Sequence, residues 1–584
     1  MSRRWPTPVF FSLEAAKEAM GVTATVEASV AKVCQTNEQA HPERNLRVRN
    51  SEMETIWHKL DHLLYLPILG LERPRCLYYY QGDGLRILYG FTYKYLPLEQ
   101  FLGQLSYVEA GQPLAAALAD CYSQAWYPGQ DALPIYSDWH SKPHWTKESA
   151  HSGSITMWGR LMPGTKQLLI NGPDGHLIGG WNHPVDSHFS QVMVEWEGKL
   201  ADMLDRPLAY TILDSEGGGL PIAQAHAQAE QAYLSVLPRG REQPLSAFAL
   251  QGEWQPVAGD EGHEVVDAHW ADAQKASADP RRLIVMRPLG RTDPTRVYAG
   301  LGIDALSAAE IPQRHRARWQ NQERRIRELI GGANLNANYG YTYREVPSRT
   351  HQRRWQAAQE SVEVIEGKLA QNQEAMRNLA CQLEQFEQTI TQRLSEQRQA
   401  LAALEAAIEV RRLAQRPVRR MTQGLQRMKR QLDTFKTRLT RRQDSLLGRI
   451  AEHQQRVSQL AQERVKRTAE RDAIDTETMR RERNLEKDQI MFNLQILLLS
   501  LHDWVRNHFL APEWQRLELE TATQLLYSKP GWVVWHQESI EIVLEPYRYA
   551  EQQRAMEVTC QRFNAANLCW RDGRLLRMRL AHEP

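Results

Sequence analysis

The chain has 584 residues, of which 42% are apolar and 24% are charged. At roughly 100–200 residues per domain, this length predicts about three to five domains. The apolar fraction excludes a wholly disordered chain. Lys and Arg (72) nearly balance Asp and Glu (70), so the net charge of +2 says nothing about partners. Only local charge asymmetry can point to nucleic acid.

The six cysteines are scattered and form no CxxC pair. This argues against a zinc ribbon or a disulfide framework and fits a reducing compartment. The first twenty residues lack the apolar core and cleavage site of a signal peptide. The most apolar run, 490–501, is too short for a bilayer and contains Asn493 and Gln495. We therefore expect a cytoplasmic protein without a membrane partner.

Residues 1–128 are biased toward helix. Segments 98–105 and 114–126 place apolar residues three and four positions apart. Turn residues at Gly111-Gln112-Pro113 separate them. Short helices joined in this way are compatible with a helix-turn-helix DNA-binding domain. They are equally compatible with a plain helical bundle.

From about residue 130 the pattern changes to α/β. A short apolar strand, 132–138, ends on Asp138, and a later strand, 207–214, ends on Asp214. Between them, 165–181 predicts a hairpin around a Gly-Pro-Asp-Gly turn, and 187–204 predicts an amphipathic helix. The expected order is strand, hairpin, helix, strand.

Residues 223–300 contain further β-like pieces, and 311–330 is a charged helical stretch. Trp254 and Trp270 lie in the β-like region. Such tryptophans are usually core residues, although they could also stack on an unpaired base.

Three acidic residues form the candidate site: Asp138, Asp214 and Glu323, the last on the charged helix. Two strand-end carboxylates and one helix carboxylate can hold two divalent cations, because Mg²⁺ prefers oxygen ligands. Such ions sit about 3.5–4 Å apart, activate a nucleophile and stabilise the leaving oxygen. On spacing alone the signal is weak, because the chain has 70 acidic residues and many strands end on Asp.

A long helix begins at about residue 355. Its apolar residues alternate by three and four, as in a heptad seam: Val362, Ile365, Leu369, Met376, Leu379, Leu383, Phe386 and Ile390. Asn372 is a polar seam position that could fix the register. Pro417 interrupts the helix, and the seam resumes at Leu425. This predicts an antiparallel coiled-coil hairpin, with a parallel dimer as the other possibility.

The last 90 or so residues predict a small α+β domain. They combine an apolar helix, 491–509, with the strand-like segments 531–535 and 538–547.

Two segments are locally basic. Residues 411–449 hold 13 Lys and Arg against two Asp, and the helix around Glu323 is rich in arginine. Both patterns favour contact with a phosphate backbone over a merely solvated face. The residues singled out for DNA contact are His140, Arg318, Trp319, Gln322, Arg324, Arg327, Arg419, Arg420, Lys429 and Arg430.

Three motifs in order resemble the catalytic domain of bacterial insertion-sequence transposases of the DDE class, which have an RNase H-like fold of the retroviral-integrase superfamily. The motifs are IYSDWHSKPHW (135–145), ILDSEGG (212–218) and RWQNQE (318–323), followed by ANLNANYGYTYREVPSR (333–349). The tail segments 493–505, 531–546 and 559–568 resemble the same group more loosely.

The motifs also depart from the family pattern. Trp139 stands where the group often has Gly, and Ser215 stands where it often has Arg. One extra residue separates Arg318-Trp319 from Glu323. Glu328 is therefore a rival third carboxylate, and Glu216 is a second acid beside Asp214.

The resemblance implies a multidomain α/β protein with six segments. They are an N-terminal helical DNA-binding domain (1–128), an RNase H-like core in two parts (129–222 and 301–350), a β-rich insertion (223–300), a coiled coil (351–490) and a C-terminal α+β domain (491–584).

It implies a nucleoid-associated transposase that binds terminal inverted repeats, cleaves the element ends and joins the 3′-hydroxyl to target DNA. Two Mg²⁺ or Mn²⁺ ions would be bound by Asp138, Asp214 and Glu323. Because two DNA ends must be coupled, a homodimer is expected on DNA. The alternatives are an RNase H-like nuclease that cuts without joining, and a catalytically inactive DNA-binding coiled-coil protein derived from a transposase.

Overall fold

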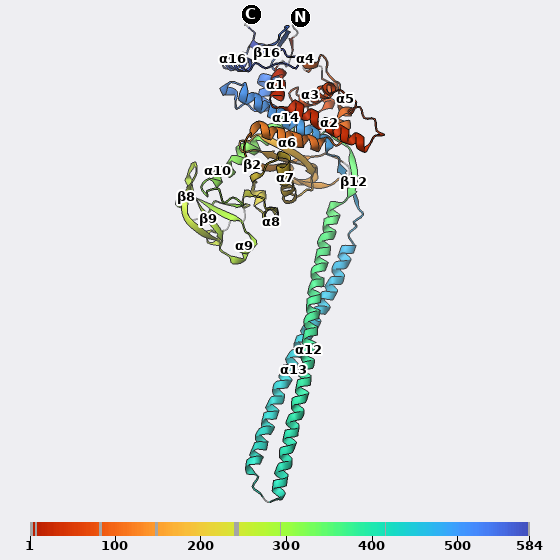
Figure 1. Cartoon of the computed structure of the whole chain (residues 1–584), viewed down its shortest axis with the longest axis vertical. Coiled ribbons are helices and arrows are strands. Elements are labelled where there is room, and N and C mark those ends of the chain that lie inside the picture. The colour runs from red at the N-terminus through yellow and green to blue at the C-terminus, as the bar shows by residue number, and fades with distance from the viewer. Residues whose placement is uncertain are drawn as a thin grey trace. The chain divides into compact units, whose positions relative to one another are not determined.

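The computed structural model describes residues 4–5, 9–80, 85–146, 150–238, 244–291, 294–414 and 416–581. The chain divides into two compact units. Unit 1 comprises residues 1–344 and 481–584, and unit 2 comprises residues 345–480. Figure 1 shows the elements of both.

Five strands form the centre of the large sheet of unit 1, in the order β5-β4-β2-β6-β7. Their bounds are Leu177–Pro184 (β5), Arg160–Asn171 (β4), Leu133–Pro143 (β2), Leu208–Ile212 (β6) and Tyr233–Val236 (β7). β2, β6 and β7 pair in parallel, whereas β4 is antiparallel to both β2 and β5. The predicted hairpin 165–181 is therefore confirmed, as β4 and β5. A short strand, β3 (Ser152–Ile155), also pairs with β4.

Helices cover both faces of this sheet. α6 (Gly111–Trp126), α7 (Phe189–Leu204) and α8 (Leu220–Gln228) share one core with the sheet, in which Trp181 stacks on Trp196. α10 (Ile311–Arg318) packs on a second core through Ile311, together with Tyr136 and Ile212. The amphipathic helix expected at 187–204 is confirmed as α7.

The expected strand end at Asp138 is wrong, because β2 continues to Pro143 and places Asp138 within the strand. Leu168 and Leu169 on β4 pair with Trp139 and Asp138, so the antiparallel neighbour extends the strand past the acid. The second acid, Asp214, does follow its strand, since β6 ends at Ile212.

The sheet continues through β11, β10, β9 and β8. These strands span Arg296–Leu301 (β11), Arg282–Pro288 (β10), Asp260–Trp270 (β9) and Phe248–Val257 (β8), and the short helix α9 spans Ala273–Ala278. The region is β-rich, as expected, except that β7 pairs in parallel with β6 and thus extends the central strands. Trp270 stacks on Phe248 and donates Nε1–H to Asp279 over 2.9 Å. It is therefore held as a structural residue.

The N-terminal helices and the C-terminal segment share one hydrophobic core. The helices are α1 (Phe10–Ala19), α2 (Val22–Ala40), α3 (Met53–Leu64), α4 (Arg86–Tyr89), α5 (Tyr95–Tyr107), α14 (Glu486–His508), α15 (Leu519–Ala522) and α16 (Ala550–Ala565). A four-stranded sheet joins the two chain ends in the order β1 (Arg4–Trp5), β14 (Gly531–Trp535), β15 (Ser539–Leu544), β16 (Leu575–Leu580). α5 and α6 contribute Leu102 and Leu114 to this core, as the helices of a bundle do.

α14 lies at the centre of that core and is buried on all sides over most of its length. Its Gln489 side chain bonds β5 twice, accepting from Asn182 N–H over 2.7 Å and donating to the Gly180 carbonyl over 2.9 Å. The Asp488 carboxylate forms ion pairs with Lys142 of β2 over 3.0 Å and with Arg483 over 2.6 Å. These contacts fix the edge of the large sheet against the helical core.

Unit 2 is a helical hairpin of α12 (Arg349–Leu413) and α13 (Arg419–Asp472), 65 and 54 residues long. Pro417 lies in the turn between them. Contacts such as Glu405–Lys429 near the turn and Gln359–Arg471 near the other end show that the helices are antiparallel. The predicted hairpin is confirmed, and Figure 1 shows the two helices side by side.

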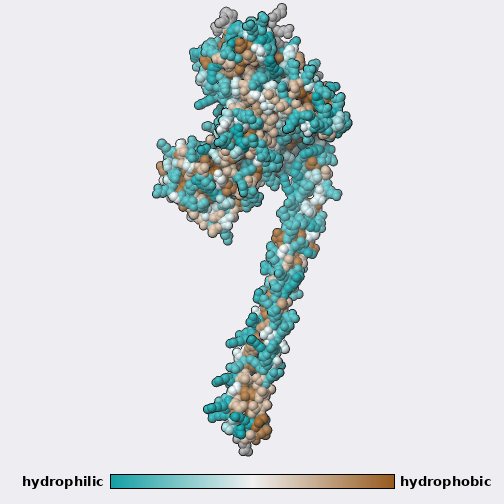
Figure 2. Space-filling model, in the orientation of Figure 1, coloured by the Kyte–Doolittle hydropathy of each residue, from teal (hydrophilic) through white to brown (hydrophobic). Residues whose placement is uncertain are grey.

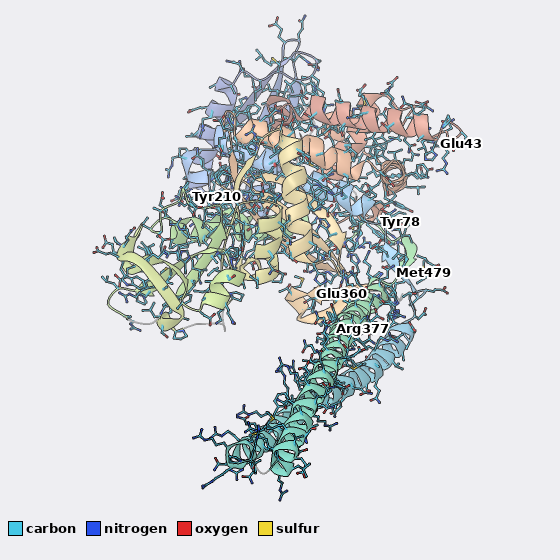
Figure 3. All side chains as sticks on the ribbon, turned by 60° about the horizontal axis from the view of Figure 1, so that its bottom comes forward. Glu43, Tyr78, Tyr210, Glu360, Arg377 and Met479 are labelled. Atoms are coloured by element: carbon cyan, nitrogen blue, oxygen red, sulfur yellow. The ribbon has the colours of Figure 1, made fainter. Side chains whose placement is uncertain are left out.

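The seam residues of the hairpin are buried or half-buried, and most flanking positions are exposed. Asn372 contacts His453 Nδ1 across the hairpin over 3.0 Å, which supports its predicted role in fixing the register. The hairpin surface is mostly hydrophilic in Figure 2. Figure 3 labels Glu360 and Arg377 on α12 and Met479 on β13. β12 (Tyr343–Pro347) and β13 (Met479–Arg483) pair at the ends of the hairpin.

Within the described residues, no helix combines the length and apolar character that a membrane crossing requires.

Gly180 offers a test of the packing between β5 and α14. A Cβ atom there would lie 2.6 Å from the Phe492 ring and 2.7 Å from Ile496 Cδ1. We expect Gly180→Ala to lower the free energy of unfolding by about 1–3 kcal/mol, because core side chains must shift. Gly424, in α13, has open space around it, so Gly424→Ala should raise stability by about 0.5–1 kcal/mol. Urea denaturation of both variants measures the two signs; a neutral Gly180→Ala would contradict this packing.

Candidate functional site

Asp138 lies within β2, and Asp214 follows the adjacent parallel strand β6. The β2–β6 register pairs Ile135 with Thr211 and Tyr136 with Ile212, two residues before each acid. Asp138 Oδ1 accepts the N–H of Trp139 over 2.8 Å. Asp214 caps the 3₁₀ turn Ser215–Gly218, accepting the N–H of Glu216 over 2.8 Å. Backbone N–H groups thus orient both carboxylates.

Glu323 reaches the same place from a π-helical turn. Trp319–Glu323 forms this turn between α10 and α11 (Arg324–Ala333). In a π-helix, residues five apart lie one above the other, whereas in an α-helix they diverge. Arg318 and Glu323, five apart, accordingly form an ion pair. The extra residue between the Arg-Trp pair and the Glu is therefore absorbed by a π turn.

Arg318 bridges two of the three carboxylates. Its guanidinium lies 3.1 Å from Asp138 Oδ2 and pairs with Glu323 through the other terminal nitrogen. The side chains are 13%, 21% and 26% exposed for Arg318, Asp138 and Glu323, so the contacts are largely shielded from water. Shielded charge-assisted contacts of this kind are stronger than surface ion pairs.

The electrostatics agree with this convergence. Burial raises the pKa of Asp138 to about 7, and the negative charge of Asp214 adds to the rise. Arg318 opposes it, and Glu323 contributes a smaller rise. The pKa of Glu216 is raised by burial and by Asp214, while Lys166 lowers it. Asp214 and Glu323 are thus near enough to influence Asp138, and Asp214 is near enough to influence Glu216.

The donor chemistry suits Mg²⁺ or Mn²⁺, because the converging groups are carboxylates. The geometry is not that of a ready ligand set. Over the part of the chain that the structure describes, no three His, Cys, Asp or Glu side chains are grouped so as to hold a metal ion. In this conformation, the Arg318 guanidinium supplies the positive charge beside Asp138 and Glu323.

The rival acid Glu328 belongs to a different cluster. It is buried, pairs with Arg325 and accepts the N–H of Leu519 over 3.0 Å. Arg325 also pairs with Asp503 of α14. This network joins α11 to α14, and Glu323 is the helix acid that shares Arg318 with Asp138.

The residues expected to contact DNA differ in their surroundings. Trp319 is 54% exposed, with the Arg327 guanidinium 4.7 Å from its ring centre. Arg324 pairs with Glu518 on the surface at 2.9 Å. His140 contacts Asn336 Oδ1 over 2.6 Å rather than Asp138.

Gln322 requires a correction. Its side chain is fully buried, so it is not accessible to DNA in this structure. It points into the protein because the π turn docks on the β4–β5 turn, where Asn321 Nδ2 donates to the Pro173 carbonyl over 2.6 Å. Gly175, at φ +93°, allows this approach, because a Cβ there would lie 2.9 Å from Asn321 Cα.

The four basic residues selected in α13 belong to unit 2. Arg419, Arg420, Lys429 and Arg430 are exposed, and Lys429 pairs with Glu405 at 2.7 Å.

Sequence reasoning missed the bridging role of Arg318 and the surroundings of Glu216. Lys166 Nζ lies 4.1 Å from the centre of the Trp139 ring, and the charge of Lys166 lowers the pKa of Glu216. The five-residue spacing of Arg318 and Glu323 was the one sequence feature that pointed to this contact. It predicts a contact only if the segment forms a π turn, because in an α-helix side chains five residues apart diverge.

Replacing Asp138 tests the electrostatics of the cluster. The pKa of Asp138, at about 7, lies above the ordinary value of 3.8, so the folded state retains a proton that the unfolded state has lost. Folding stability therefore falls as the pH rises from about 4 to 7. We expect Asp138→Asn to remove this loss, so that its stability gain over wild type in EDTA grows across that window and then levels off. Thermal unfolding measures this gain, with exposed Asp131→Asn as the control. A gain that does not depend on pH would contradict the raised pKa of Asp138.

Comparisons with known proteins add little. No protein-family model and no curated protein matches the chain. Among solved structures, one that matches is the cryo-EM synaptic complex of piggyBac transposase with hairpin DNA. The identity is 9% and the TM-score 0.29, over 56% of this chain and 70% of that chain. Similarity at this level carries no argument about function.

Proposed function

We propose that the protein is a DDE transposase with an RNase H-like core. The observation that carries the proposal is the Arg318 bridge between Asp138 of β2 and Glu323 of the π turn, with Asp214 near enough for its negative charge to raise the pKa of Asp138. The strand order β5-β4-β2-β6-β7, in which β4 alone is reversed, supports the RNase H-like assignment. The π turn Trp319–Glu323 lies within the third motif, RWQNQE, and accommodates its extra residue, which further supports the RNase H-like assignment.

In this proposal the three acids bind two Mg²⁺ or Mn²⁺ ions. When bound, such ions activate water or a 3′-hydroxyl and stabilise the leaving oxygen. The protein fixes the acids through the β2–β6 register, the Asp214 cap and the π turn. The substrates would be the terminal inverted repeats of the element and a target DNA. A homodimer on DNA follows from the need to join two ends at once.

The basic segment of unit 2 supports a DNA partner. Residues 411–449 carry 13 Lys and Arg against two Asp, and Arg419, Arg420 and Arg430 are exposed. A flank that only pairs charges within a coiled coil would be closer to balanced. We therefore assign backbone contact with DNA to this segment.

One observation favours a second candidate, an inactive DNA-binding protein of transposase origin. The acids are compensated by Arg318, and the described residues contain no ready ligand set. A nuclease of the same fold uses the same metal chemistry, so it differs from a transposase only in failing to join the cut strand.

A cleavage and joining assay tests the enzymatic proposal. The full chain is incubated with its terminal repeats and Mg²⁺, and with a pre-cleaved terminus plus target DNA. We expect nicking and joined products, and a loss of roughly 100-fold or more in Asp138→Asn, Asp214→Asn and Glu323→Gln, since each removes charge from the centre.

Glu195→Gln is the matched control, because Glu195 is exposed and pairs with its helix neighbour Lys199. Nicking without joining would indicate a nuclease. DNA binding without cleavage, equal in wild type and Asp138→Asn, would exclude the enzyme.

The salt dependence of DNA binding tests the basic segment. Each lost phosphate contact should flatten the plot of log K against log salt by about 0.9. We expect Arg419→Ala/Arg420→Ala/Arg430→Ala to weaken binding and flatten the slope by up to about 2.7. Arg456→Ala, exposed on the same helix but outside the segment, is the control. An unchanged slope, measured by fluorescence anisotropy, would remove unit 2 from the DNA interface.

A further inference from the structure

Arg318 combines three properties that an ordinary surface arginine lacks. It is 13% exposed, it uses both terminal nitrogens, and its partners are two of the three acids of the candidate site. Basic neighbours on the same helix have other partners: Arg314 donates to Tyr210 at 3.0 Å, and Arg316 to Asp260 at 2.8 Å. The bridge is thus specific to Arg318.

The bridge offsets the electrostatic repulsion between the acids that it joins. Asp138 and Glu323 are like charges from distant parts of the chain that lie close enough to share one guanidinium. Shielded carboxylates repel one another unless a cation or a proton compensates them. A guanidinium can satisfy two carboxylates at once, because its donors form a rigid fork.

We infer that Arg318 is an internal counter-ion that competes with divalent cations for Asp138 and Glu323 and moves onto a DNA phosphate when substrate binds. This inference rests on the proposed function and adds its regulation. It accounts for two acids that share a guanidinium although the residues described by the structure include no ready set of metal ligands.

The local structure allows this exchange without refolding. The backbone of the π turn is held by Asn321, which donates to Pro173, and by the close approach at Gly175. Only the arginine side chain must move, and rotation about its stem bonds is fast compared with backbone rearrangement. A phosphate offers the same bidentate partner as a carboxylate, so the guanidinium can exchange one for the other.

Thermodynamic linkage gives the exchange a measurable consequence. If Arg318 blocks metal binding, DNA that takes Arg318 away must tighten metal binding, and metal must tighten DNA binding by the same factor. Ions would then be bound firmly only when a phosphate is present. Metal-loaded enzyme without DNA would be rare at low metal concentration.

The test measures Mn²⁺ affinity of the full chain by electron paramagnetic resonance, so that no catalytic activity is needed. Without DNA, we expect Arg318→Met to bind Mn²⁺ at least about tenfold more tightly than wild type, which corresponds to about 1.4 kcal/mol. Arg316→Met, on the same helix but paired with Asp260, should match wild type. Asp138→Asn in each background should weaken binding, which locates the ion.

A second arm adds a short duplex. Mn²⁺ affinity should rise in wild type and stay unchanged in Arg318→Met. Equal affinities of wild type and Arg318→Met without DNA, or an equal rise with DNA in both, would overturn the inference. If no protein binds Mn²⁺ under any condition, the proposed function itself fails.

If Arg318→Met does not fold, as judged by circular dichroism, the wild-type protein decides the question. Absence of any tightening of Mn²⁺ binding by DNA would then overturn the inference. Arg318→Lys provides a folded comparison, because it keeps the charge but cannot bridge both acids with one planar fork.

Discussion

Arg318 links two acids from distant parts of the chain, Asp138 of β2 and Glu323 of the π turn, through a pair of partly shielded ionic contacts. Asp214, which follows β6, and Glu323 of the π turn are both near enough for their negative charges to raise the pKa of Asp138, so the fold brings like charges together. Such a cluster persists only with compensation from a proton, a guanidinium or metal ions. The raised pKa favours a proton on Asp138, and the Arg318 bridge places a positive charge beside it. Both reduce the repulsion between the carboxylates.

The remaining architecture holds this concentration of charge in place. α14 fixes the edge of the large sheet through Gln489 and through Asp488, which receives Lys142 from β2 itself. The cluster of Arg325, Glu328 and Asp503 joins α11 to the same central helix. The strand and the helix that carry acids are thereby tied to one buried element, so their relative position does not depend on the acids.

Sequence reasoning recovered the periodic parts of the fold, whereas the shared metal-binding role of Asp138, Asp214 and Glu323 stays a prediction. Heptad spacing and Pro417 were sufficient for the hairpin, and the Gly-Pro-Asp-Gly turn was sufficient for β4 and β5. It placed the end of β2 wrongly at Asp138. Pairing with β4 extends β2 past that residue, and such pairing cannot be read from the local sequence. It also could not foresee that Gln322 turns inward, or that Arg318 faces Glu323, because both depend on a π turn that leaves no periodic signal.

The most direct test of the central claim is a crystal structure of the protein with Mn²⁺ and a cleaved DNA end, read by anomalous scattering. The account predicts manganese peaks ligated by Asp138, Asp214 and Glu323, with the Arg318 side chain withdrawn from Asp138 and directed at a phosphate. Peaks elsewhere, or carboxylates that still hold Arg318 beside bound DNA with no metal among them, would contradict it.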